Sequence, residues 1–418
     1  MIKSLLLLKK LFCFICKNFP EMMKRRKGVL GWLVSFFFVA VTLPACAGRP
    51  VLPGAYDMER YLPLLEGKRV AVVANQTSRV GEAHLVDTLL ARGVKIVRIF
   101  SPEHGFRGEA GAGESVRDGV DTRTGLPIVS LYGKHRKPLP EDLADVDVVI
   151  FDIQDVGVRF YTYISTLHLV MEACAEQGKE MIVLDRPNPN GFYVDGPVLD
   201  TAYRSFVGMD PVPVVHGMTP GEYARMLNGE KWLKKGVQCR LTVIPCRNYT
   251  HRSIYELPVR PSPNLPNMRA VYLYPSLCFF EGTIMSVGRG TDFPFEVYGH
   301  PEYPDHTFSF TPRSIPGAAP HPKYEGQTCY GVDLRNIPLR FLRDNGMLVL
   351  DWLLDAYDEM GKKEEFFNAY FDKLAGSDQL RKQILAGKDK YTIRASWKKD
   401  LEAFKKIRKK YLLYPNFE

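Results

Sequence analysis

The chain has 418 residues, of which 45% are hydrophobic, and a formal net charge of +9. Residues 1–45 contain eight Lys or Arg and one Glu, so they carry +7 of that charge and leave +2 on the rest. The basic character therefore comes from the N-terminal segment, and it gives no reason to predict a nucleic-acid partner.

The N-terminal segment is typical of a bacterial lipoprotein signal. Lys24–Lys27 is basic, Gly28–Thr42 is apolar, and small residues precede Cys46. We predict that residues 1–45 are removed and that Cys46 is lipidated. The protein would then be exported and held in the cell envelope by its lipid, facing the periplasm. An uncleaved membrane anchor is the alternative, but the apolar run is short for a bilayer span.

The other cysteines indicate neither a metal site nor a disulfide framework. Outside the leader and Cys46 their number is odd, and their spacing is not that of metal ligands. They are Cys174, Cys239, Cys246, Cys278 and Cys329. We predict an apolar structural role for each, with a local Cys239–Cys246 bridge as the alternative. The nine histidines are scattered, so we predict no metal site.

Four apolar runs rich in β-branched residues each lead into a polar cluster. The runs are 69–73, 94–100, 146–151 and 181–184, and the clusters are 75–77, 101–105, 152–155 and 185–189. Predicted helices are 83–92, 162–177 and 220–227, and a further predicted strand is 241–244. This alternation predicts a parallel α/β sheet, in which ligands bind outside the carboxyl ends of the strands. We therefore predict an enzyme site at that edge.

The chain changes character after residue 247. Twelve prolines between Pro258 and Pro322 predict loops with short strands and no helix. From residue 348 the pattern is helical again, and a last apolar stripe predicts a packed amphipathic helix, with membrane binding as the alternative. The stripe is Trp397, Leu401, Phe404, Ile407 and Tyr411. We divide the chain into a leader (1–45), a linker (46–66), an N-terminal domain (67–250) and a smaller C-terminal domain (251–418).

Glu103 is the strongest candidate for chemistry. It follows a predicted strand, His104 is its neighbour, and Arg107 is close, so burial or charge can move its pKa either way. In the alternative interpretation the segment is a turn whose Glu and His contact only nearby backbone.

The segment 151–163 is the second candidate. Asp152, Gln154 and Tyr161 could face the crevice, where planar groups and rings suit sugar hydroxyls. Arg159 could pair with an acid there. The alternative is that Asp155 caps the following helix and Arg159 is its ion-pair partner.

Further polar residues stand on stiff or glycine-containing segments. Asp185 and Asn188 lie among prolines that fix the backbone, and prearranged polar groups lower the cost of binding. Similar candidates later in the chain are His216, Asn264, Glu281 and Arg289. A dinucleotide site, a P-loop, a zinc protease motif and a nucleophile elbow are all excluded by the absence of their motifs. Acids, amides, tyrosines and arginines remain, and these are typical of glycoside chemistry without a cofactor.

At these motifs the chain resembles the exo-β-N-acetylmuramidases of peptidoglycan recycling, a family formerly described as a domain of unknown function. The matching stretches include 75–77, 101–108, 131–133, 136–138, 151–165, 185–189, 196–199, 216–219, 261–264, 280–283, 286–291 and 294–296. The resemblance covers essentially the whole chain after the leader. It implies a Rossmann-like parallel-sheet domain followed by a smaller α/β (α+β) domain, with the active site in the cleft between them. The segment 301–322 departs most from the pattern.

The resemblance implies release of terminal β-1,4-linked N-acetylmuramic acid from the non-reducing ends of peptidoglycan fragments. Such hydrolysis usually needs two carboxyl groups, whose separation decides retention or inversion. Our hypothesis makes Glu103 the general acid and Asp152 or Glu281 the second carboxylate. The lactyl carboxylate would bind Arg289, Arg159 or Arg186, because a guanidinium grips a carboxylate bidentately. Further predicted sugar contacts are His104, Gln154, Tyr161, Asp185, Asn188, His216 and Asn264.

Two other functions remain open from the sequence. A non-catalytic muropeptide- or sugar-binding lipoprotein could use the same crevice. An envelope esterase or amidase is the other alternative, and the missing nucleophile elbow speaks against it.

Overall fold

The computed structural model describes residues 49–107 and 118–418. Residues 51–418 form one compact unit. In these described ranges no helix is long and apolar enough to cross a bilayer. The predicted signal and Cys46 lie outside the described residues, so export and lipidation stay predictions.

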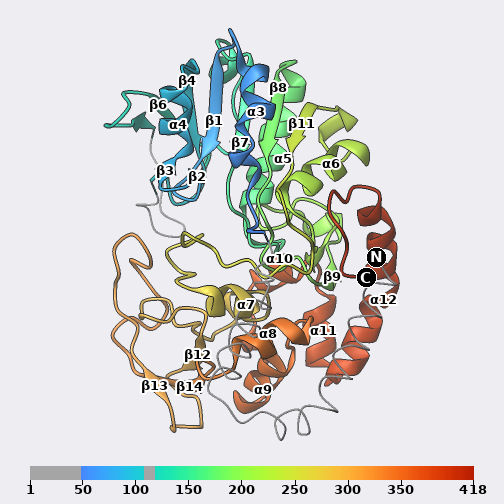
Figure 1. Cartoon of the computed structure of the whole chain (residues 1–418). Helices are drawn as coiled ribbons and strands as arrows, with labels where there is room; N and C mark the ends of the chain where they lie inside the picture. The colour runs from blue at the N-terminus through green and yellow to red at the C-terminus, as the bar shows by residue number, and fades with distance from the viewer. Residues whose placement is uncertain (1–48, 108–117) are drawn as a thin grey trace, which may run out of the picture. The chain divides into compact units, whose positions relative to one another are not determined.

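A seven-stranded sheet forms the centre of the N-terminal half (Figure 1). Its order is β11-β8-β7-β1-β4-β6-β5, and neighbours run parallel except that β5 is antiparallel to β6. The strands are β1 (Val70–Ala74), β4 (Ile96–Ser101), β5 (Gly119–Val120), β6 (Pro127–Ser130), β7 (Val148–Asp152), β8 (Glu180–Leu184) and β11 (Arg240–Ile244). The predicted α/β fold is confirmed. Chain order reverses at β1, between β4 and β7, and a crevice opens at such a switch point.

Alternate residues of the strands supply two cores, one on each face of the sheet. In β1, Ala71 and Val73 join one core while Val70 and Val72 join the other. Helices α5 and α6 complete the first core and α4 the second. Both faces are therefore covered, which is why the strands are continuous apolar runs. The helices are α4 (Leu85–Ala91), α5 (Tyr163–Glu176) and α6 (Pro220–Gly229), and β2 (Arg79–Val80) and β3 (Ala83–His84) form a small hairpin.

Part of the predicted linker is folded against the sheet. Residues 54–65 contain two 3₁₀ turns and the short helix α3 (Met58–Tyr61). Tyr61 is fully buried in the second core, and its hydroxyl donates a hydrogen bond to the carbonyl of Ala55 (2.9 Å). Residues 54–65 therefore pack on the face of the sheet that forms the second core, before the first strand begins.

The expectation that prolines exclude helices from residues 258–322 is wrong at one place. Helix α7 (Met268–Leu277) contains Pro275. Proline has no N–H for the carbonyl of Val271 one turn earlier. The side-chain amide of Asn190 donates to that carbonyl instead (3.3 Å). A bond from the N-terminal half thus compensates the helix for the proline.

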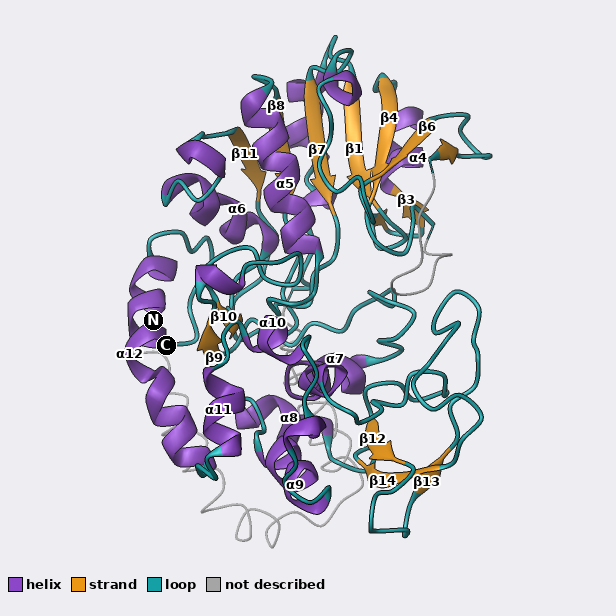
Figure 2. Ribbon diagram, turned by 180° about the vertical axis from the view of Figure 1, so that it is seen from behind, coloured by secondary structure: helices purple, strands orange, loops and turns teal. Residues whose placement is uncertain are grey.

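The C-terminal half combines helices with a small antiparallel sheet of order β12-β14-β13 (Figure 2). These elements are β12 (Val297–His300), β13 (Ser309–Phe310), β14 (Cys329–Asp333), α8 (Leu339–Asn345), α9 (Asp351–Glu359), α10 (Phe371–Ala375) and α11 (Gln379–Leu385). The five cysteines in the described residues are buried free thiols, so Cys239 and Cys246 are not bridged.

The last helix returns to the N-terminal half. Helix α12 (Lys390–Lys409) packs on β9 (Asp195–Val198), which pairs with β10 (Pro213–Val215). Trp397 and Phe404 are buried in the main core. The apolar stripe therefore makes a packed helix, as predicted, and it is not available for insertion into a membrane.

Candidate active site

Two adjoining cavities lie beyond the carboxyl ends of the strands, with walls from both halves of the chain. The smaller has a volume of about 60 Å³ and the larger of about 310 Å³. Their shared walls join them into one cleft, and the residues in common are Glu103, Phe160, Thr162, Tyr274 and Arg289. The cleft thus lies where the switch point of the sheet places a ligand site.

Glu103 is held by two hydroxyl groups. It follows β4 in a turn in which His104 has a φ of 72°, and it is half-buried. The hydroxyl of Tyr132 donates to one carboxylate oxygen (2.8 Å) and that of Thr162 to the other (2.9 Å). Burial raises the pKa of Tyr132, so its phenol stays protonated. Tyr132, after β6, and Thr162, the N-cap residue of α5, therefore fix the Glu103 carboxyl group in the cleft.

Glu281 is fixed in a different way, by a cation. Arg289 donates from Nε and Nη2 to the two carboxylate oxygens, both at 3.0 Å. Burial opposes ionisation, but the charge and hydrogen bonds of Arg289 hold the pKa of Glu281 below its ordinary value. The guanidinium also lies over the ring of Phe295, 4.9 Å from its centroid. Glu281 is therefore a carboxylate at neutral pH.

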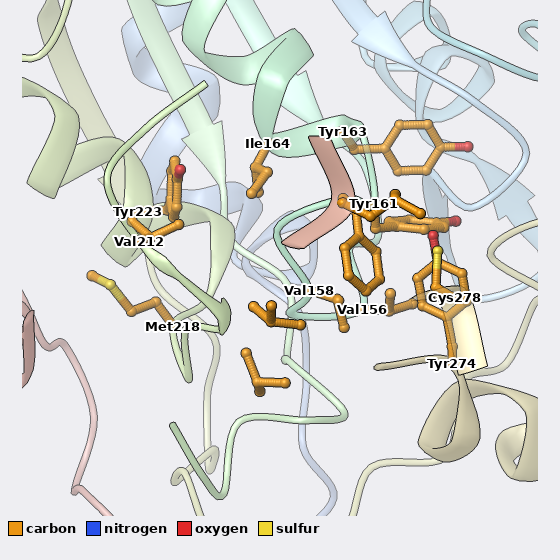
Figure 3. Close-up of a cluster of buried hydrophobic side chains, with 14 of the residues drawn as sticks. Val156, Val158, Tyr161, Tyr163, Ile164, Val212, Met218, Tyr223, Tyr274 and Cys278 are labelled. Carbon is orange, nitrogen blue, oxygen red and sulfur yellow. The ribbon is translucent and has the colours of Figure 1, made fainter. Parts of the chain in front are cut away.

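The smaller cavity has aromatic walls and a polar side. Tyr161, Tyr163 and Tyr274 form one wall and lie at one end of the buried cluster in Figure 3. The Tyr161 hydroxyl donates to the carbonyl of Pro261 (2.7 Å), which ties the wall to the C-terminal half.

On the polar side of this cavity, His104 Nε2 lies 3.1 Å from the hydroxyl oxygen of Ser262. That oxygen accepts a hydrogen bond from the backbone N–H of Asn264 (3.2 Å). The His104, Tyr161 and Asn264 predictions therefore fall together at one cavity.

The larger cavity carries cationic side chains that the sequence analysis did not select. Arg136 is exposed and lies over the ring of Phe206 at 4.5 Å, and Lys373 of α10 is also exposed. Tyr132 and Thr162 were missed as well. Arg136 and Tyr132 follow β6, a short strand with a mixed burial pattern that apolar periodicity does not reveal.

The structure does not bring Asp152 and Arg186 to the cleft. Asp152 is fully buried, and Arg186 donates to both of its oxygens (2.6 and 2.8 Å). Neither residue lines a cavity. Their charges neutralise each other in the interior, so the places predicted for them, as second carboxylate and as lactyl-binding cation, are not supported.

Asp185, Asn188 and Gln154 are likewise occupied inside the protein. Asp185 accepts from Thr219 Oγ1 and the N–H of Gly221 (both 2.7 Å), and burial raises its pKa to about 7. The side-chain amides of Asn188 and Gln154 donate to backbone carbonyls. These three side chains hold the segments after the strands together rather than facing a cavity.

Arg159 and His216 are also buried away from the cleft. Arg159 donates to the carbonyls of Pro197, Val212 and Leu374, each at 2.8 Å. Asp155 accepts from the N–H of Gly157 (2.6 Å) and does not cap α5, so the alternative Asp155–Arg159 pair is wrong too. Burial lowers the pKa of His216 to about 3, so it is neutral. Within the described residues no group of three or more His, Cys, Asp or Glu could hold a metal ion.

Comparisons with known proteins agree on one family. The N-terminal model of exo-beta-N-acetylmuramidase NamZ matches residues 70–269, and the C-terminal model matches residues 272–414. The peptidoglycan beta-N-acetylmuramidase NamZ of Bacillus subtilis (strain 168) is 39% identical in an alignment of 386 residues, and the match covers 85% of this chain and 89% of that protein.

Two solved structures of DUF1343 family proteins from Bacteroides fragilis NCTC 9343 are also similar. One has a TM-score of 0.82 and 49% identity, and covers 88% of this chain and 100% of its own. The other has a TM-score of 0.75 and 30% identity, and covers 87% and 99%.

Proposed function

Because this chain belongs to the exo-β-N-acetylmuramidase NamZ family, we propose that it hydrolyses the β-1,4 bond of terminal N-acetylmuramic acid in peptidoglycan fragments. The family resemblance predicted from the sequence is confirmed, and with it the class of glycoside hydrolase. One observation carries the assignment to this cleft. Two carboxyl groups line the larger cavity, and hydroxyl groups hold Glu103 whereas a guanidinium holds Glu281.

Glu103 is the general acid in this proposal. The hydroxyls of Tyr132 and Thr162 can each donate or accept a hydrogen bond, so they can hold the carboxyl group in either protonation state. Glu103 can therefore give a proton to the leaving oxygen and recover it without rearranging its neighbours. General acid catalysis contributes roughly 10²–10⁴-fold to such reactions.

Glu281 is the second carboxylate in this proposal. Of the two candidates, Glu281 lines the larger cavity and Asp152 does not. Its lowered pKa keeps it ionised in the cavity that Glu103 also lines, where a negative charge stabilises an oxocarbenium-like transition state. The bidentate Arg289 restrains the Glu281 carboxylate, which suits electrostatic stabilisation of the sugar.

The two cavities suit different parts of the substrate. The larger, at about 310 Å³, is in the range of pockets that hold small ligands, so we place the sugar ring there. The smaller is too small for a ring and has aromatic walls with one polar side, which suits the methyl and amide of the acetamido group. Among the three arginines predicted to bind the lactyl carboxylate, Arg289 lines the cavities while Arg159 and Arg186 are enclosed.

Export and a lipid anchor at Cys46 remain part of the proposal, supported by the signal-like sequence of residues 24–46. Such an anchor would place the enzyme in the envelope beside its substrate. Metabolic labelling with a fatty-acid analogue tests this directly. We expect label on the wild type and none on Cys46→Ala, and equal labelling of the two would reject the anchor.

Turnover of a chromogenic β-N-acetylmuraminide tests the hydrolase. We expect release by the wild type and a loss in kcat of about a hundredfold or more for Glu103→Gln, with the melting temperature kept. The matched control is Glu302→Gln, an exposed glutamate that lines neither cavity, and it should keep wild-type turnover. Binding of muraminides without any turnover would instead identify a sugar-binding protein.

A further inference from the structure

Positive charge is concentrated on helix α12. Between Lys390 and Lys410 the chain has nine Lys or Arg and two acids, a formal charge of +7. Residues 46–418 together carry +2, so the remainder of that range carries −5. One helix therefore holds a basic excess in a chain that is otherwise acidic after the leader.

The charge lies on the side of α12 that faces away from the core. Trp397 and Phe404 are buried on the inner side, and the outer face is formed by Lys398, Lys399, Lys406 and Lys409, all exposed. None of these four ammonium groups lies within 4 Å of a carboxylate among the described residues. The acid on this face is Glu402, and it already lies 3.6 Å from Lys405. We call these four lysines the basic face.

Helix α12 lies along one flank of residues 51–418 in both ribbon views (Figure 1, Figure 2). Neither cavity of the cleft has a residue of α12 in its described lining. A flat surface can therefore cover the basic face without covering the proposed active site.

The compact unit begins beside the end of this helix. Val51 packs in a small cluster with Leu413 and Tyr414, which follow α12 directly. Leu52 pairs with Arg247 through two backbone hydrogen bonds (3.0 and 2.8 Å). The start of the folded chain is thus fixed next to the C-terminal end of the basic helix.

A lipid on Cys46 would hold this corner close to a membrane. Four residues lie between Cys46 and Val51, so five Cα–Cα steps join them and can span at most about 18 Å. That maximum reach is about twice the distance of roughly 8–10 Å over which charges act in physiological salt, so a tether that is not fully extended lets the C-terminal end of α12 approach the headgroups to within that distance. The proposed anchor therefore brings the basic face within range of the headgroups.

We propose that the basic face of α12 docks on the anionic phospholipid headgroups of the membrane that carries the anchor. A lipid surface is the occupant that fits, because the tether ends beside α12 and a row of lysines matches negative headgroups in charge. The apolar side of the helix is already used, so the contact is electrostatic and on the surface. Tethering raises the local concentration of the two surfaces, so this weak attraction is enough to orient the enzyme with α12 on the membrane.

Vesicle co-sedimentation tests the face apart from the anchor. The probe is a vesicle of equal parts phosphatidylcholine and phosphatidylglycerol, and the protein is the Cys46→Ser chain from residue 46 onward. We expect binding at low salt that salt abolishes, and none to phosphatidylcholine alone. Replacing all four lysines of the basic face with Gln should weaken binding by about tenfold or more.

The matched control replaces four exposed lysines that lie outside α12, namely Lys95, Lys134, Lys362 and Lys363, with Gln. This control should bind vesicles like the parent, and both sets should keep muraminide turnover. Equal losses in the two sets would show a general charge effect and overturn the proposal. Absence of binding to the anionic vesicles would overturn it too. Because fatty-acid labelling tests the anchor separately, failure of the anchor and failure of the face are distinguishable.

Discussion

The cleft and the buried polar groups behind it come from the same sheet edge but differ in what surrounds them. Glu103 follows β4 and lies in a cavity, held by two hydroxyls. Asp152 ends β7, next to β1 in the same sheet, and is fully enclosed with Arg186. A carboxylate at a strand end can therefore serve catalysis or stabilise the fold. Its role depends on whether later segments of the chain pack over it.

This comparison predicts that substitutions of the buried polar residues and of the cleft residues have different effects. Changes to the buried residues should cost stability, whereas changes in the cleft should cost turnover at unchanged stability. Four substitutions, in decreasing order of expected effect, can break or sharpen that separation.

Asp152→Asn should destabilise the protein most. It leaves the Arg186 guanidinium buried without its counter-charge, which typically costs about 3–5 kcal/mol. Chemical denaturation measures the loss. The control Asp292→Asn breaks an exposed pair with Arg313 and should cost less than about 1 kcal/mol. If Asp152→Asn were as stable as the wild type but had no turnover, Asp152 would have a catalytic role and the comparison would be wrong.

Asp155 should make stability fall as pH rises. Burial raises its pKa from 3.8 to about 7 in the folded protein, so between these values the unfolded chain ionises first and releases its proton. Stability is then lost progressively from about pH 4 to about pH 7, by about 1.4 kcal/mol for each tenfold difference in proton affinity. Unfolding measured across this range should show a flatter profile for Asp155→Asn. An unchanged profile would show that Asp155 is ionised in the folded state.

Glu281→Gln should reduce kcat about 10–100-fold. The charge beside the sugar disappears, while the amide oxygen can still accept one hydrogen bond from Arg289. Folding should be retained, because the side chain is half-buried in the cleft. Steady-state kinetics and a melting curve on the same sample give both values. A fall in melting temperature without a fall in kcat would place Glu281 with the structural group.

Tyr132→Phe should have the smallest effect, roughly a 3–10-fold loss of kcat, because one hydrogen bond to the Glu103 carboxyl group is removed while that from Thr162 is kept. Tyr391→Phe, on an exposed tyrosine of α12, is the control. An unchanged kcat for Tyr132→Phe would show that the Tyr132 hydroxyl does not position Glu103.

The fold was predictable because it rests on local pattern. Apolar runs such as 146–151 are continuous since both faces of the sheet are covered, and residues 219–222 carry the capping box that begins α6. Helix α7 was not predictable, because the bond that tolerates Pro275 comes from Asn190, far away in the chain. Division of the chain at residue 250 stays a prediction.

The candidate site was predictable only in part. The sequence places both Glu103 and Asp152 at strand ends, but it does not indicate how deeply each side chain is buried. Depth is set by later contacts, such as the one between Tyr161 and the carbonyl of Pro261, a hundred residues on. Tyr132 and Arg136 were missed because β6 is short and weakly patterned.

The return of α12 to the N-terminal half has a consequence for how the enzyme forms. Arg408 donates to the carbonyl of Gly217, and the Tyr414 hydroxyl donates to Asp185, beneath the sheet edge that bears the cleft. A chain made from its N-terminus exposes this edge until residues 408–414 have been synthesised, so the sheet cannot mature as an independent early unit. Assembly of the site thus depends on contacts of long sequence separation, which predicts slow folding.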